Sequence, residues 1–392
     1  MYCYANENLK NRMSFEIVEL QNFRNFKNEV IKLEDGVNVF FGDNAQGKTN
    51  FLESLYILSR GKSFRTLDIS HCLKDEFENE IQKTVLKSDF KDIYSVNNKF
   101  RIEIEKNKKT VWLNQKRTLS TKLSTLCPVV LFSPESLSAI KNGPSERRDL
   151  IDDLIESLPE FSKSVTQFRK ILRARNKILS DLKKGIKKEE SVKLTLEAID
   201  EIFLKHSLDL IELRMFFLNM LEPYIIQSIK FLFGEDMVFK FSYEALKVEN
   251  LDFYPKKWAE ILKSDLIRLY SAEIAVGHSL IGPHKHEVQF ILNGKDSRYY
   301  CSQGQQRGLI IAFKVAEVLY RLQTRNERPV LLLDDVMSEL DEGKRIKLVD
   351  FLKSINSQII ITTTDRSNNI EKTMGKHSQF KIDQGKILNL DV

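Results

Sequence analysis

The chain has few cysteines and no long apolar stretch, and each of these absences excludes a class of protein. Its 4 cysteines are isolated, so no C-x-x-C pair supports a zinc site or a disulfide framework; they are Cys3, Cys72, Cys127 and Cys301. Isolated cysteines predict reduced thiols. No run approaches the roughly 18 apolar residues of a membrane helix. Residues 1–13 lack the apolar core and cleavage site of a signal peptide. We therefore expect a cytoplasmic protein without membrane association.

Composition adds two broad limits. With 42% hydrophobic and 30% charged residues, the chain predicts a folded protein rather than a disordered one. Its 392 residues suffice for one large domain with a second domain or an insertion. The formal charge of +6, from 61 basic and 55 acidic residues, is compatible with a nucleic-acid partner but does not require one.

A glycine-rich loop near the N-terminus predicts a phosphate site. Gly42-Asp43-Asn44-Ala45-Gln46-Gly47-Lys48-Thr49 fits the G-x-x-x-x-G-K-[ST] pattern, between an apolar strand at 37–41 and a helical pattern. Backbone N–H groups and the helix N-terminus would hold phosphate oxygens. Lys48 would contact the β- and γ-phosphates, and the Thr49 hydroxyl would ligate Mg²⁺. ATP and Mg²⁺ are therefore the predicted cofactors.

An acidic pair near residue 334 complements this loop. Val330–Leu333 predicts a buried parallel strand that delivers Asp334 and Asp335 at its carboxyl end, where ligands bind in α/β sheets. Alone, two acids at a strand end would be interpreted as solvated. Together with the glycine loop, Asp334 is predicted to hold Mg²⁺, and Asp335 is predicted to polarise the attacking water and so act as the catalytic residue.

A third polar segment, Ser302–Arg307, starts a helical pattern over 304–322. Ser302 is a candidate N-cap for that helix. A cap alone does not explain Gly304 and Gln305 beside it.

The remaining patterns predict an α/β fold interrupted by helices. Strand patterns dominate up to residue 132, and long amphipathic helices run from about 135 to 230 with a hairpin tip at 181–188. A helix at 256–276 and a strand at 286–292 follow, and strand and helix then alternate. We predict a P-loop ATPase head, a mixed sheet with flanking helices, divided by a mainly helical inserted domain. The predicted domains are 14–134, 135–280 and 281–392.

The chain resembles the ABC-type ATPases in four segments, which are Gly42–Thr49, Ser302–Arg307, Asp334-Asp335 and Ser338–Asp341. A longer set, in the family's order, narrows the resemblance to the RecF family of bacterial recombination mediators. The set comprises Asn22-Phe23-Arg24-Asn25-Phe26, Gly42–Asn50, Gly61–Thr66, Phe132–Glu135, Gly143–Arg148, Gly282–His284, Ser302–Leu309, Leu331–Asp341 and Ile361–Thr364.

The resemblance implies more than the residues alone. ATP would join two protomers into a clamp on duplex DNA near single-strand gaps, and slow hydrolysis would release it. The resemblance also implies that the protein assists the loading of RecA, with RecR and RecO as partners. The processes it implies are recombinational repair, replication restart and the SOS response. Ser302, Gly304 and Gln305 would close over the nucleotide of the opposite protomer. Arg24, Asn25 and Asn50 would add to the chain's own nucleotide site.

Several lesser assignments keep two readings. Arg65 lies in a loop resembling the DNA-contacting arginine loop of chromosome-maintenance ATPases, or it is a surface arginine. A phosphate-binding face and the solvated side of a helix both fit Arg147, Arg148, Arg169, Lys170, Arg173 and Arg175. His284 and His286 supply only two candidate metal ligands. Trp112 and Trp258 are expected in the core.

Three other functions share parts of this pattern. A long-armed structural ATPase of chromosomes would need far longer coiled coils than 135–280 can form. An ATP-gated nuclease would need an acidic metal cluster after Asp341, and those residues show none. A module that binds nucleotide without hydrolysing it stays open, because the shorter carboxylate of Asp335 stands where many ABC ATPases have glutamate.

Overall fold

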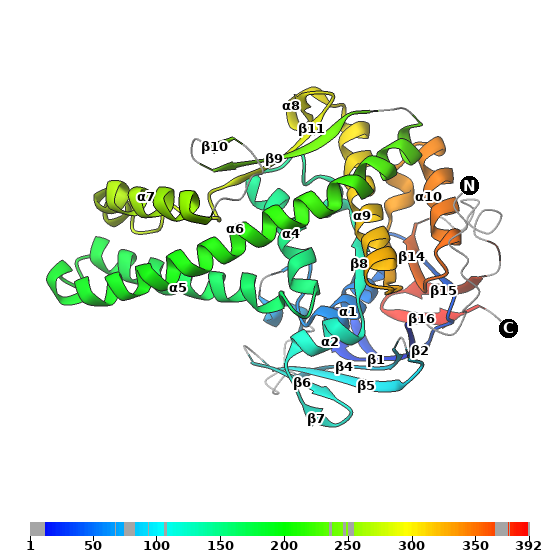
Figure 1. Ribbon diagram of the computed structural model, residues 1–392. Helices are drawn as coiled ribbons and strands as arrows, with labels where there is room; N and C mark the ends of the chain where they lie inside the picture. The colour runs from blue at the N-terminus through cyan, green and yellow to red at the C-terminus, as the bar shows by residue number, and fades with distance from the viewer. Residues whose placement is uncertain are drawn as a thin grey trace. The chain divides into compact units, whose positions relative to one another are not determined.

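The computed structural model describes residues 12–66, 68–73, 83–92, 94–105, 108–234, 237–245, 248–249, 255–364, 375 and 377–390 (Figure 1). The chain divides into two compact units. The first holds Met1–Ser138, Gln227–Glu235 and Arg307–Val392, and the second holds Ala139–Ile226 and Asp236–Gln306. The domain boundaries expected at 135 and 281 remain predictions. None of the described helices has the length and apolar character needed to cross a bilayer.

The first unit contains a mainly parallel sheet in the order β16-β15-β3-β14-β13-β8. Strands β15, β3, β14, β13 and β8 are parallel to their neighbours, and β16 closes the edge as an antiparallel hairpin with β15. The central strands are short apolar runs buried on both faces, as parallel strands require. Their bounds are β3 Val37–Phe41, β8 Val129–Phe132, β13 Val330–Asp334, β14 Ile359–Thr363, β15 His377–Asp383 and β16 Lys386–Asn389.

A second sheet of the same unit is antiparallel, in the order β2-β1-β4-β5-β6-β7. Its strands alternate buried and more exposed side chains, so one face packs inward. Their bounds are β1 Ser14–Phe23, β2 Phe26–Lys32, β4 Lys83–Lys91, β5 Asn97–Glu105, β6 Lys108–Leu113 and β7 Lys116–Arg117.

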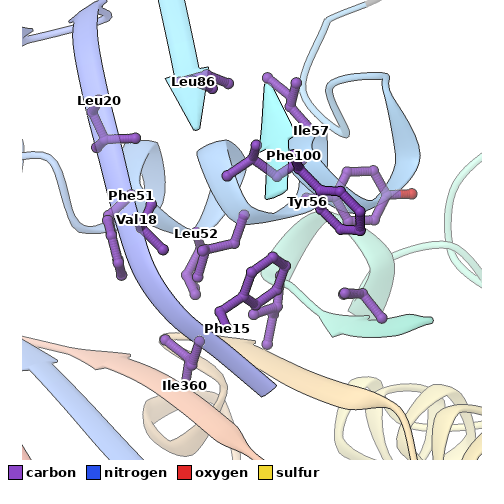
Figure 2. Close-up of a cluster of buried hydrophobic side chains, with 14 of the residues drawn as sticks. Phe15, Val18, Leu20, Phe51, Leu52, Tyr56, Ile57, Leu86, Phe100 and Ile360 are labelled. Atoms are coloured by element: carbon purple, nitrogen blue, oxygen red, sulfur yellow. The ribbon is translucent and has the colours of Figure 1, made fainter. Parts of the chain in front are cut away.

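Helix α1, Lys48–Arg60, forms the centre of the core because it contacts strands of both sheets. Its side chains meet apolar residues such as Phe15, Phe100 and Ile360 in one continuous cluster (Figure 2). The helix ends at Gly61, whose φ of 65° suits glycine and whose N–H donates to the Ile57 carbonyl at 2.7 Å. Burial of α1 on both sides therefore fixes the loop that precedes it.

Three shorter helical elements, two 3-10 turns among them, and the helices α9 and α10 complete the first unit together with α2. The helix predicted at 304–322 is confirmed as α9, and α10 continues the alternation of strand and helix that was predicted after residue 292. These elements are α2 Ser120–Leu126, α3 Pro134–Leu137, α9 Gln303–Thr324, α10 Glu342–Ser354 and the 3-10 turns η1 Ile69–Cys72 and η2 Val336–Glu339. Helix α9 begins within the second unit and continues into the first.

The second unit is mainly helical, and its long helices are α4 Pro144–Ser157, α5 Ser162–Lys183, α6 Glu189–Phe233 and α7 Pro255–Val276. The end of α6, from Gln227 on, belongs to the first unit. The turn between α5 and α6 confirms the predicted hairpin tip, and Ile178, Leu179, Val192 and Leu196 pack beneath it. A small sheet, ordered β10-β9-β11-β12, accompanies the helices. Its elements are β9 Phe239–Ala245, β10 Val248–Glu249, β11 Glu287–Leu292 and β12 Lys295–Asp296, followed by helix α8 Ser297–Tyr300. The sequence prediction missed β9, although Phe239, Phe241 and Tyr243 alternate there as in a half-buried strand.

Buried arginines hold the second unit together. Arg175 is 0% exposed and donates to Asp200 at 2.6 Å, to Glu273 at 2.7 Å and to the Ser279 hydroxyl at 2.9 Å. The idea that Arg175 belongs to a phosphate-binding face is therefore wrong, because its guanidinium joins α5, α6 and α7 inside the unit. A charge this deep is tolerated only because carboxylates neutralise it.

Replacing Arg175 with Met should lower the free energy of unfolding by about 3–5 kcal/mol, because Glu273 and Asp200 would lose their buried counter-charge. The matched control is Arg268→Met, which breaks the exposed pair with Asp265 and should cost less than about 1 kcal/mol. Urea unfolding of both variants measures the difference. Equal losses would show that the Arg175 network does not stabilise the fold.

Candidate functional site

Three parallel strands end at the same edge of the sheet, and the predicted site residues follow them. The glycine loop follows β3, Asp334 closes β13, and Thr362 lies on β14 between these two strands. The buried Asp334 Oδ1 accepts a hydrogen bond from Thr49 Oγ1 at 3.0 Å and from Thr362 Oγ1 at 2.7 Å. Burial raises the pKa of Asp334, although both hydroxyls act against that shift. Thr49 and Asp334 thus share one small polar space, as a Mg²⁺ site requires.

The loop itself has the backbone conformation of a phosphate cradle. Ala45 has a φ of 64° and Gly47 a φ of 120°, both in the region that side chains disfavour. The Lys48 ammonium donates to the carbonyls of Gly42 at 2.6 Å and Asp43 at 2.8 Å. Burial lowers the pKa of Lys48, while Asp335, Asp334 and Asp43 act in the opposite direction. The ammonium therefore lies over the loop and close to the acidic pair.

Asp335 carries two signs of a functional position. Its φ of 47° is left-handed and strained for a residue other than glycine. Among the described residues, its Oδ1 is buried with no hydrogen-bond partner, which is costly unless a ligand or water completes it. Burial also raises the pKa of this carboxyl group. The carboxylate fits a water or metal-ligand role at the strand end.

Three hydrogen bonds that the sequence did not reveal hold the glycine loop at Gln46. The Gln46 carbonyl accepts from Asn25 Nδ2 at 2.7 Å and from the Gly385 N–H at 3.2 Å. The Gln46 side chain accepts from the Gln384 N–H at 2.6 Å. Because β15 runs parallel to β3, the turn after β15 arrives at the same edge as the loop. Asn25 therefore supports the loop, and its predicted contact with the nucleotide remains a prediction.

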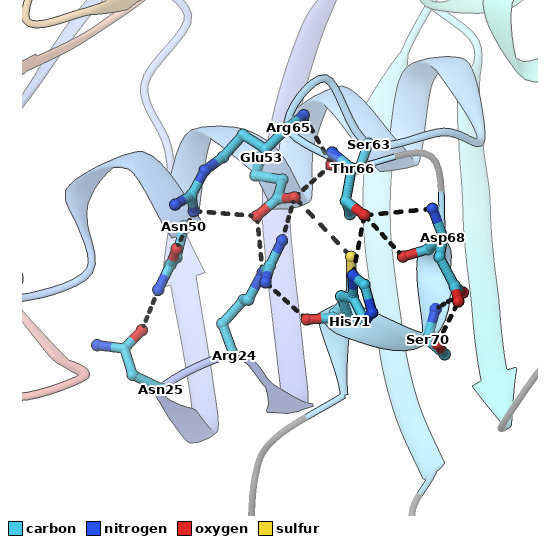
Figure 3. A network of polar contacts seen from close by, with 11 residues as sticks. Arg24, Asn25, Asn50, Glu53, Ser63, Arg65, Thr66, Asp68, Ser70 and His71 are labelled. Carbon is cyan, nitrogen blue, oxygen red and sulfur yellow. Dashed lines mark hydrogen bonds and ion pairs between the residues drawn. The ribbon is translucent and has the colours of Figure 1, made fainter.

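Arg24 and Asn50 belong to a polar network that also includes Asn25, Glu53 and Arg65 (Figure 3). Buried Glu53 receives a two-pronged ion pair from Arg24, at 3.0 and 2.8 Å. Arg65 lies 3.6 Å from Glu53 and donates to Asn50 Oδ1 at 2.8 Å, and Asn50 donates to Asn25 Oδ1 at 2.8 Å. A continuous path of polar contacts thus joins Arg65 to the glycine loop.

The segment Ser302–Arg307 is an exposed helix start. Ser302 Oγ accepts from the Gln305 N–H at 3.2 Å and the Ser302 N–H donates to Gln305 Oε1 at 2.9 Å, so the predicted cap is confirmed. Gly304 is exposed, and a Cβ added there would meet no atom within 4 Å. Arg307 pairs with Glu339 of η2 at 2.6 Å. The hydroxyl and the glycine are open to an incoming group.

The predicted DNA contacts fare unequally. Arg147 is 3% exposed and forms a two-pronged pair with Glu287 at 2.9 Å, so its assignment to DNA is corrected to a structural role. Arg148 is half-buried and donates to the His286 carbonyl at 2.7 Å. Arg173 is exposed on α5, and the Arg65 side chain is 38% exposed. Arg169 is also 43% exposed, but its guanidinium is paired with Glu156 and Asp149, so Arg65 and Arg173 remain the candidates for a contact with DNA.

The structure also shows the surroundings of the two histidines and the two tryptophans. His286 is buried and its Nδ1 lies 2.9 Å from the Tyr243 hydroxyl, beside buried Trp258. Burial lowers the pKa of His284 to about 4. No group of three or more potential metal ligands exists in the part of the chain that the structure describes. Trp258 lies in the core as expected, whereas Trp112 is half-buried with Arg101 over its ring.

Known proteins resemble this chain in sequence and in fold. Residues 14–386 match the family described as RecF/RecN/SMC N terminal domain. "DNA replication and repair protein RecF" of Heliobacterium modesticaldum is 31% identical, over 96% of this chain and 99% of its own length. Its namesake in Ligilactobacillus salivarius is 34% identical over 96% and 97%. A solved structure of the recombination mediator protein RecF with ATP, in the RecFOR pathway, is 28% identical with a TM-score of 0.82, covering 98% of this chain and 100% of that one. The Smc head domain of Pyrococcus furiosus, 17% identical with a TM-score of 0.54 over 96% of each chain, shares the fold.

The support behind the loop can be tested with two matched glycines. Gly385 and Gly294 have φ values of 74° and 75° in two-residue hairpin turns, so alanine costs each about 1–2 kcal/mol of backbone strain. Only at Gly385 would the added Cβ overlap the Asn25 carbonyl; at Gly294 nothing lies within 4 Å. We expect Gly385→Ala to weaken ATP binding about tenfold by calorimetry and Gly294→Ala to leave it unchanged. Equal affinities would show that the turn does not position the loop.

Proposed function

Because the chain belongs to the RecF/RecN/SMC N-terminal domain family, and within it to the RecF proteins, we propose an ATP-dependent DNA-binding protein of replication and repair. Two protomers would join when ATP binds and would clamp duplex DNA near single-strand gaps. The observation that carries this proposal is the shared Asp334 carboxylate, which draws the glycine loop and the acidic strand into one site.

The residues fit ATP and Mg²⁺. The loop geometry and Lys48 suit a polyphosphate, and Thr49 with Asp334 offers the oxygen ligands that Mg²⁺ prefers. The unpartnered Oδ1 of Asp335 supplies a further acceptor where a water would have to be oriented. When bound, the metal would neutralise charge on the transferring phosphoryl group. Similar structures are described as RecF with ATP and RecF with ATPrS.

Lys48 and Asp335 would have different roles in ATP hydrolysis. Lys48 would leave the loop carbonyls and place its charge on the β- and γ-phosphates. Asp335 would hold and orient the attacking water. Its side chain is one methylene shorter than that of glutamate, so it reaches less far and favours slow turnover. We propose a weak ATPase without nuclease activity, in which hydrolysis releases the DNA.

A second protomer would complete each site. Ser302 and Gly304 are exposed at a helix start, where N–H groups and a small hydroxyl suit a terminal phosphate. We propose that Ser302, Gly304 and Gln305 contact the nucleotide held by the opposite chain. This arrangement makes dimerisation depend on ATP and makes hydrolysis depend on the dimer.

DNA contact is proposed at the exposed guanidinium groups of Arg65 and Arg173, with Arg148 as a weaker candidate. Arg65 connects through Asn50 and Asn25 to the glycine loop, so we propose that DNA binding at Arg65 changes the affinity of the loop for nucleotide. By the family likeness we also propose a cytoplasmic location, cooperation with RecR and RecO in loading RecA, and roles in recombinational repair, replication restart and the SOS response. The segments 14–134, 135–280 and 281–392 would be the ATPase halves and the inserted domain.

Two single variants and their mixture test the shared site. Ser302→Arg should keep ATP binding by the monomer but lose ATP-dependent dimerisation and hydrolysis, because the arginine fills the space of the opposite nucleotide. Lys48→Ala should weaken ATP binding about 10- to 150-fold, since a charge-assisted contact is lost. In the mixture, each heterodimer has one site with both defects and one with neither, so phosphate release should partly return. An inactive mixture that nevertheless forms heterodimers, detected by light scattering, would contradict the shared site.

Asp335→Asn should separate binding from turnover. Asn keeps the side-chain shape and removes the charge that orients water, while Lys48, Thr49 and Asp334 are unchanged. We expect phosphate release at least about 100-fold slower, and ATP-bound dimers that leave gapped duplex DNA more slowly than wild type in a dissociation assay. Turnover at the wild-type rate would assign the catalytic carboxylate elsewhere.

A further inference from the structure

Two exposed tyrosines lie immediately before the exposed helix start at Ser302. Helix α8 carries Tyr299 and Tyr300, which are 69% and 68% exposed. Each ring has a cation beside it: Arg298 lies 5.1 Å from the Tyr299 centroid and Lys295 lies 5.3 Å from the Tyr300 centroid. We call Lys295, Arg298, Tyr299 and Tyr300 the tyrosine patch. Both rings are open to solvent, whereas Arg298 is half-buried. Exposed tyrosine rings with an arginine beside them are typical of protein contact surfaces.

The tyrosine patch is held rigidly against the start of α9. The buried Gln306 side chain donates to the carbonyls of Ser297 and Arg298, both at 3.0 Å. Asp296 caps α8 by accepting from the Arg298 N–H at 2.9 Å. The patch and Ser302 therefore move as one piece. This pre-organisation lowers the entropy lost when a partner binds.

We infer that the tyrosine patch is a contact surface for a second copy of this chain, beside the shared nucleotide site. The inference rests on the proposed function, in which a partner protomer approaches Ser302. Tyr300 is two residues from Ser302, so their Cα atoms are at most about 7.6 Å apart. A stable interface covers roughly 800 Å² on each partner, which corresponds to a disc of about 16 Å radius. A protomer that reaches Ser302 closely enough to share a phosphate therefore also covers the patch.

DNA is the competing occupant, since rings and cations also suit nucleic acid. The position next to Ser302 favours the second protomer. In the proposed function, the nucleotide held by an approaching protomer must come within hydrogen-bond reach of Ser302, whereas nothing in the described residues brings a DNA strand to that point. The two occupants predict different losses when the rings are removed.

The test compares a double variant with a matched control. Tyr299→Ala with Tyr300→Ala removes both rings from the patch. Tyr94→Ala removes a ring that is 78% exposed in the turn between β4 and β5, far from Ser302 in sequence. We expect the double variant to weaken ATP-dependent dimerisation at least about tenfold in analytical ultracentrifugation, with monomer ATP affinity and melting temperature unchanged. The control should dimerise as wild type does.

Three outcomes would overturn the inference. Dimerisation of the double variant at wild-type affinity would remove the patch from the interface and leave the proposed function intact. Unchanged dimerisation with weaker binding to a gapped duplex would assign the patch to DNA instead. A wild-type chain that stays monomeric with ATP and Mg²⁺ would contradict the proposed function itself, and the inference would fail with it.

Discussion

One hydrogen-bonded carboxylate organises the candidate site. Asp334 accepts from Thr49 and Thr362, and it thereby connects the helix after the glycine loop with two other strands of the parallel sheet. Parallel strands end at the same edge, so residues that are 285 positions apart in the chain meet there. The buried carboxylate needs these hydroxyls in an apolar core, and the core needs helix α1 between its sheets. Loop, acid and core therefore stabilise one another.

The same burial shifts the pKa values of the charged groups in the site. Burial raises the pKa values of Asp334 and Asp335 and lowers that of Lys48, so each charged form is disfavoured relative to water. A divalent cation would stabilise the charged forms of the two aspartates, and a polyphosphate would stabilise the charged form of Lys48, because each brings the opposite charge to groups that are already desolvated. The site thus gains more from such a ligand than an exposed cluster would.

Burial also divides the arginines and aromatic residues of the second unit into two roles. Arg175 and Arg214 are buried and ion-paired, and they fix helices and loops within the unit. Arg298 and the two tyrosines of α8 are on the surface, so they can serve recognition. Residue type alone does not separate these roles. Solvent exposure separates them, since a paired buried guanidinium has no approach for a phosphate.

The α/β fold could be predicted from the order of strand and helix patterns along the chain. The glycine loop, the acidic pair and the Ser302 cap could be predicted because each depends on neighbours a few residues away. Periodicity missed β9, whose pairing with β11 is a tertiary contact. Three contacts could not be predicted in this way: Arg147 pairs with Glu287, Gln384 and Gly385 hold Gln46, and Thr362 donates to Asp334. Such contacts join distant segments through strand order and register, and a spacing rule within one segment carries no information about them.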